Sequence, residues 1–236
     1  MSKKITKPKK EKKMSIKSNA KQFSAKLILG ICIIMLMNTY SYSLIFANRM
    51  GEPFGDNGER NVNSSVSFYI VSGADNYLAG YSGFLVVLNR VEKAPAPDAL
   101  DFSEVQKLLD STISTMEKAK ENYEFLKQIA DTTPYNPVVI DKLLSFDYSG
   151  FCRERGLNKD AFEDVKQFLG KGDARGVFNK ILTDTTVILN SLNTIKISVD
   201  MKRFPLLSNL WRLNQRFAET LLFGQYCAEV MVAIGD

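Results

Sequence analysis

The chain has 236 residues and a mass of 26.5 kDa, and its 45% hydrophobic and 24% charged residues are the balance of a globular domain. It contains no histidine, which excludes histidine-based catalytic triads, HExxH zinc sites and the ExxH di-iron motif of helical bundles. Ten of the 31 basic residues lie in the first 26 positions beside a single acidic residue. The remainder is mildly acidic, so the net charge of +5 does not indicate a nucleic-acid partner.

The N-terminal region has the pattern of a secretory signal sequence. Its lysines precede an apolar run from Leu27 to Met37, and Ser41 and Ser43 are small residues spaced as signal peptidase requires. We therefore predict a signal sequence with an extended basic part over residues 1–47, and an extracytoplasmic location, either periplasmic or secreted. The alternative is an uncleaved anchor, because residues 27–48 carry no charge over about the ~20 residues that span a bilayer. That anchor would be the chain's only contact with a membrane.

Residues 48–63 are rich in glycine and polar turn formers and predict a flexible linker. From Ser64 onward the apolar residues recur at helical spacing, on a stripe that runs from Ile70 to Val91. Three glycines weaken this helix, and a strand over residues 66–71 is the alternative. The Ala-Pro-Ala-Pro stretch at residues 94–97 ends the element.

The second helix is predicted over residues 101–131. Asp101 can cap it and Glu104 can complete a capping box, while the apolar stripe from Phe102 to Ala130 alternates steps of three and four residues. Two shorter helices are predicted next, over residues 137–146 with Asn136 as cap and over residues 159–169 with Asn158 as cap. The stretch between them is expected to be irregular.

The last two helices are predicted to be long. Asp173 caps one, whose stripe runs from Val177 to Val199, and Pro205 opens the other, whose stripe runs from Leu206 to Met231. Since only residues 201–204 separate them, they are expected to be antiparallel neighbours. The sequence thus predicts an all-α fold over residues 64–236: an up-down antiparallel bundle of four long helices with an insertion of two short helices.

Two cysteines remain beyond the leader, Cys152 and Cys227. In an oxidising compartment a disulfide between them would tie the irregular connection to the last helix, and two buried thiols are the alternative. They are too few for a structural zinc site, and glutamates 117, 121 and 124 alternate with lysines as on a solvated helix surface. We expect no metal and no cofactor.

The last helix is apolar on nearly every side from Phe217 to Ile234, so it is either covered by the short helices or meets a partner. The second interpretation gives a groove in which aromatic rings supply area and charges supply orientation. Its candidate residues are Tyr123, Trp211, Arg212, Arg216, Tyr226 and Glu229.

No catalytic motif is present in the sequence, so the chain is predicted to be no enzyme. We expect an exported helical-bundle protein that acts as a non-enzymatic protein-interaction or structural module, with another protein or a second copy of itself as partner. The alternative is a binder of a small apolar ligand held between the helices. The aromatic residues for that site would be Phe84, Tyr123, Trp211, Phe217 and Tyr226.

Overall fold

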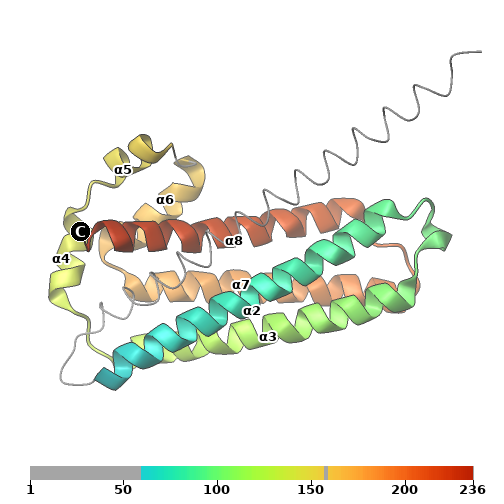
Figure 1. The fold of residues 1–236 in the computed structure, drawn as a ribbon, viewed down its shortest axis with the longest axis horizontal. Coiled ribbons are helices and arrows are strands. Elements are labelled where there is room, and N and C mark those ends of the chain that lie inside the picture. Colours follow the sequence, from blue (N-terminus) through green and yellow to red (C-terminus); the bar gives the residue numbers. More distant parts are fainter. Residues whose placement is uncertain (1–59, 157–158, 236) are drawn as a thin grey trace, which may run out of the picture. The chain divides into compact units, whose positions relative to one another are not determined.

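The computed structural model describes residues 60–156 and 159–235, all of which belong to one compact unit of the chain (Figure 1). Across these residues the structure is helical and contains no strand, which confirms the all-α class and the helical bundle. The α-helices are α2 (Arg60–Lys93), α3 (Phe102–Thr132), α4 (Pro137–Ser145), α5 (Tyr148–Arg155), α6 (Lys159–Phe168), α7 (Ala174–Asp200) and α8 (Leu207–Ala233). The predicted leader, and the predicted linker up to residue 59, lie outside the described residues. Helix α2 begins at Arg60, inside the predicted linker, and includes the segment for which a strand was the alternative.

Helices α2 and α3 pack closely because three glycines of α2 face α3. A Cβ atom at Gly73 would lie 2.8 Å from the ring of Tyr123, which is nearer than real Cβ contacts come. In the same way, a Cβ atom at Gly80 would meet the Met116 side chain, and one at Gly83 would meet the Thr112 side chain. These residues, which weaken an isolated helix, therefore allow two helix backbones to approach each other.

Helix α8 is held against α2 by aromatic side chains around Phe217. Its ring stacks on Tyr81 at 4.9 Å and on Phe84 at 5.2 Å between centroids, and lies edge-on to Tyr77 at 5.7 Å. The Tyr77 hydroxyl donates to the Phe217 carbonyl, and the Tyr81 hydroxyl donates to Asn214 Oδ1, each at 3.0 Å. Such offset and edge-on pairs add to the stabilisation that burial of the rings provides. The contacts fix the rotation of α8 about its own axis.

The insertion contains three short helices rather than the predicted two. Residues 148–155, which were expected to be irregular, form α5. Asp147 caps it by accepting from the Gly150 amide at 2.9 Å, and Gly156 ends it with φ of 59°. Two turns are too short to show an apolar period, so these start and stop signals were the only sequence evidence for the helix.

Helix starts were predicted well where a side chain caps them. Asp101 accepts from the Glu104 amide at 3.0 Å, and Asp173 accepts from the Gly176 amide at 2.7 Å. The Glu104 carboxylate, predicted to complete a capping box, pairs with Arg90 at 3.0 Å and so joins the end of α2 to the start of α3. Figure 1 shows the four long helices lying along one another, with α4, α5 and α6 gathered at one end.

Replacing Gly73 by alanine is expected to destabilise the protein, whereas the same change at Gly224 is expected to stabilise it. Both glycines lie inside helices, where alanine is favoured by about 1 kcal/mol. At Gly224 a Cβ atom meets nothing within 4 Å, but at Gly73 it meets the buried ring of Tyr123, and overpacking costs about 1–3 kcal/mol. Urea unfolding of both variants measures the difference. Equal stabilisation by the two changes would contradict the close packing of α2 on α3.

Candidate functional site

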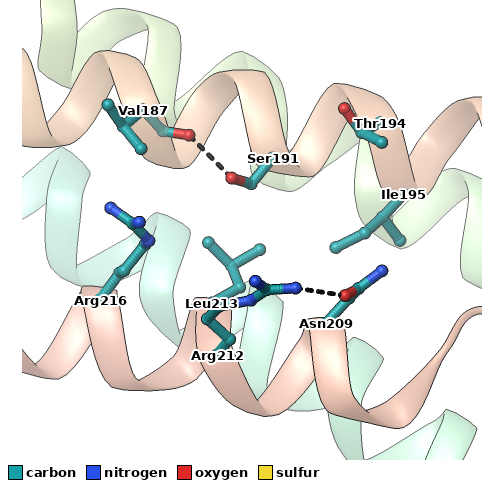
Figure 2. A pocket seen from close by; sticks show the side chains of 8 residues that line it. All are labelled: Val187, Ser191, Thr194, Ile195, Asn209, Arg212, Leu213 and Arg216. Atoms are coloured by element: carbon teal, nitrogen blue, oxygen red, sulfur yellow. Dashed lines mark hydrogen bonds between the residues drawn. The ribbon is translucent and has the colours of Figure 1, made fainter.

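A surface pocket of about 270 Å³ lies between α7 and α8 (Figure 2). One wall of the pocket is a face of α7, formed by residues three or four positions apart. The other wall is formed by α8, which contributes two arginines one turn apart and an asparagine beside them. The lining residues are Val187, Ser191, Thr194, Ile195, Asn209, Arg212, Leu213 and Arg216.

The floor of the pocket is apolar and its walls are polar. Ile195 and Leu213 are buried, since each faces the core of the bundle. The Ser191 hydroxyl donates to the Val187 carbonyl at 2.9 Å, and the Thr194 hydroxyl donates to the Asn190 carbonyl at 2.9 Å. Because both hydroxyl protons are used within α7, the guanidinium groups are the main donors left for a ligand. A ligand with acceptor oxygens therefore fits this pocket best.

The two arginines of the pocket form no ion pair with the described residues. Arg212 donates to Asn209 Oδ1 at 2.7 Å, and the described residues place no carboxylate within ion-pair distance of Arg212 or Arg216. The lysines of α7 differ in this respect. Lys180 lies 3.3 Å from Asp164 and 3.0 Å from Asp184, while Lys196 lies 3.0 Å from Asp110 and 3.3 Å from Asp200.

Lys180 ties α6 to α7 and has a structural part in the bundle. Burial lowers its pKa, but hydrogen bonds and charge interactions with Asp184 and Asp164 outweigh this and raise the pKa above its ordinary value. Its ammonium also lies 5.1 Å from the centre of the Phe223 ring. The Lys180 ammonium group is therefore occupied by contacts within the bundle, whereas the guanidinium groups of the two pocket arginines can bind a ligand.

Tyr226 and Glu229, predicted to share a groove with the two arginines, lie elsewhere. Glu229 lies 17 positions after Arg212 on α8, which is about 25 Å at the rise of an α-helix. Glu229 is only 5% exposed, accepts from Gln225 Nε2 at 3.0 Å and lies 3.9 Å from Arg155 Nη1 of α5. The Tyr226 ring lies edge-on to Phe162 of α6 at 5.9 Å. The short helices thus cover this end of α8.

The remaining aromatic candidates do not share a cavity either. Tyr123 is buried between α3 and α2, and burial raises its pKa. Trp211 is 52% exposed on the surface. Phe84 and Phe217 are completely buried and stack on each other, so the space between these rings is filled. The structure therefore places Arg212 and Arg216 in the pocket but none of the other predicted site residues.

Cys152 and Cys227 are thiols in the structure, and no disulfide joins them. Cys152 lies in α5 and is half-buried, and Cys227 is completely buried in α8. Burial raises the pKa of the Cys227 thiol, which keeps it protonated and slow to react.

Sequence reasoning missed the polar residues that line the pocket with the two arginines, namely Ser191, Thr194 and Asn209. A signal for them was present. In two helices joined by a short turn, residues at equal distances from the turn lie side by side, and positions 195 and 213 are equally far from residue 204. Helical spacing then places Ser191 and Thr194 on one wall, with Asn209, Arg212 and Arg216 on the other.

The described residues define a class of protein rather than a particular one: an α-helical bundle with a basic surface pocket. Among them there is no group of three or more side chains able to hold a metal ion. None of the described helices is long and apolar enough to cross a membrane. Compared with known protein families, curated proteins and solved structures, the chain matches none.

A double-mutant cycle of Arg155→Ala and Glu229→Gln is expected to give a coupling energy of about 0.5–1 kcal/mol. The carboxylate of Glu229 is buried, and Arg155 is the cation that faces it from α5. Thermal or urea unfolding of the four proteins gives the value. If the two changes were simply additive, Glu229 would not hold α5 against α8, and its buried carboxylate would need another explanation.

Proposed function

We propose that this chain is an exported, extracytoplasmic helical-bundle protein without enzymatic activity, which binds another protein or a second copy of itself through the pocket between α7 and α8. The observation that carries the proposal is a pair of arginines, Arg212 and Arg216, that have no ion-pair partner among the described residues and lie on a surface pocket with an apolar floor. Two guanidinium groups one turn apart suit the carboxylates of an acidic partner segment, because each can bind a carboxylate with two hydrogen bonds.

We also infer that the four long helices alternate in direction as an up-down bundle. The pairs Tyr77 with Phe217 and Tyr81 with Asn214 support this, because residue numbers rise along α2 as they fall along α8. The ion pair between Asp110, near the start of α3, and Lys196, near the end of α7, agrees with it. In such a bundle both sides of the pocket belong to one rigid helical hairpin.

The interior gives the small-ligand alternative no support. A bundle that holds a ligand between its helices needs space in the core. Here the Phe217 ring contacts three aromatic side chains of α2. The space beside the α2 glycines is occupied by side chains of α3. The surface pocket is the better candidate site.

Export is expected to remove the leader. We expect protein recovered from the producing cell to begin near Leu44, after the small residues Ser41 and Ser43. Sequencing the N-terminus of that protein, in the soluble and membrane fractions separately, measures this. A chain that keeps Met1 and is found in the membrane would instead be anchored, and a chain that keeps Met1 in the cytoplasm would end the export proposal.

Partner binding can be tested by photo-cross-linking in the producing cell. A photoreactive residue at Thr194, in the pocket, is expected to give an adduct of defined mass, while one at Glu121 on the exposed face of α3 is not. The adduct should disappear when Arg212 and Arg216 are both changed to glutamate, because the charge that holds the partner is reversed. An adduct of twice the chain mass would identify a second copy as the partner.

The matched control for charge reversal is the pair Arg153→Glu and Lys171→Glu, two exposed cations of the insertion. This variant should keep the adduct at Thr194. Equal loss of the adduct in both variants, or the same adducts at Thr194 and Glu121, would exclude the α7–α8 pocket as the binding site.

A further inference from the structure

A cluster of exposed apolar side chains surrounds the turn between α7 and α8. We call it the hairpin tip and define it as Ile197, Met201, Leu206, Leu207 and Trp211. Met201 is 59% exposed and Leu206 66% exposed, so nothing within the described chain covers them. Single exposed apolar residues are normal on a protein, but five within 15 positions of one helical hairpin are an unusual concentration of exposed apolar surface, which is typical of an interaction site.

Cations accompany the apolar side chains. Between residues 200 and 216 the chain carries Lys202, Arg203, Arg212 and Arg216 but only one carboxylate, Asp200, which is paired with Lys196. The four cations are exposed. Since the chain after residue 26 is mildly acidic as a whole, this concentration of positive charge is local to the hairpin tip and the pocket beside it.

One of these cations, Lys202, lies at the residue that ends α7. Lys202 has φ of 54°, in the left-handed region where glycine is favoured, and is the only described non-glycine residue with positive φ. The amides of Lys202 and Arg203 donate to the carbonyls of Val199 and Ser198, each at 2.8 Å, and so close α7. This hydrogen-bond pattern commonly ends a helix, usually with glycine at the left-handed position, and here it leaves the Lys202 side chain exposed.

We propose that the hairpin tip binds the surface of a bilayer that contains anionic lipids. The apolar side chains would enter the boundary between headgroups and acyl chains, and Lys202 and Arg203 would contact lipid phosphates. Tryptophan is favoured at this depth because its ring is apolar while its N–H can hydrogen-bond. Each cation near an anionic surface adds to the attraction.

The shape of the surface favours lipid over a protein partner. Peptide segments commonly dock into grooves, whereas the hairpin tip lies on the outside of a turn and its apolar side chains are exposed. The pocket between α7 and α8 is the groove of this region, and it remains the proposed site for a protein. The two proposals therefore concern different surfaces and can fail independently.

The same end of the unit also limits how it can approach a bilayer. The connection between α2 and α3, which Figure 1 shows at the same end as the α7–α8 turn, carries Asp98 and Asp101. An anionic surface would repel these carboxylates. The hairpin tip is therefore expected to bind in a tilted orientation, with the first turns of α8 nearer to the lipid than the α2–α3 connection.

The experiment uses the fluorescence of Trp211, which is the only tryptophan in the full chain. The apolar segment at residues 27–48 can itself associate with vesicles, so co-sedimentation would not be informative, but Trp211 reports the position of the hairpin tip alone. The full chain is mixed with vesicles of phosphatidylcholine, or of phosphatidylcholine with phosphatidylglycerol, with and without brominated acyl chains. We expect emission at shorter wavelength and bromine quenching only with the anionic vesicles.

Three variants make the result specific. Leu206→Ser with Leu207→Ser should abolish quenching, and Phe68→Ser with Phe125→Ser, two exposed apolar residues of α2 and α3, should leave it unchanged. Lys202→Gly with Arg203→Gln should lower the ratio of inserted to uninserted chain by a factor on the order of 30. The glycine relieves the strained φ, so this variant should unfold at the same or a higher temperature. Loss of binding together with retained stability separates a lipid-binding role from a structural one.

Unchanged Trp211 emission with every vesicle would overturn the proposal. So would equal quenching with neutral and anionic vesicles combined with no effect of the Lys202 and Arg203 changes. Shielding of Trp211 from an aqueous quencher that depends on protein concentration, without lipid, would show that a second copy covers the tip. That outcome would also overturn lipid binding while leaving the pocket proposal intact.

Discussion

The structure depends on how Phe217 packs against α2. Three aromatic rings of α2 contact this side chain, and two hydrogen bonds from Tyr77 and Tyr81 reach the same turn of α8. Together they fix which side of α8 faces the core. Once this side is fixed, the direction in which every other α8 side chain points is also fixed, because helix geometry sets the angle about the helix axis between one position and the next. Arg212 and Arg216 then face α7, and Trp211 faces solvent.

The two halves of α8 have different surroundings because the insertion covers only one of them. Helices α5 and α6 bury Tyr226 and the carboxylate of Glu229 at the C-terminal half, where Arg155 supplies the counter-charge. The N-terminal half has no such cover among the described residues, and its arginines and apolar residues are exposed. The interaction surfaces proposed for this chain all lie where the insertion does not reach.

Prediction from sequence was best where one side chain determines a local structure. Asp101, Asn136 and Asp173 each cap a helix as expected, since a cap depends only on its own backbone neighbours. Helix α5 was missed because eight residues carry no apolar period. The three α2 glycines were interpreted as helix-weakening residues, since their benefit, close approach of α3, comes from residues about 30–50 positions away in the sequence.

By itself, the sequence determined the helical class and the positions of the long helices, because spacing of apolar residues along a helix is a local property that chain order records directly. It also singled out two arginines of α8 that share a pocket. Only the tertiary structure decided which candidates share that pocket and which are buried elsewhere. The reason is that the C-terminal half of α8 is apolar on nearly every side. From the sequence alone it cannot be decided which of these sides is covered by another helix and which faces solvent.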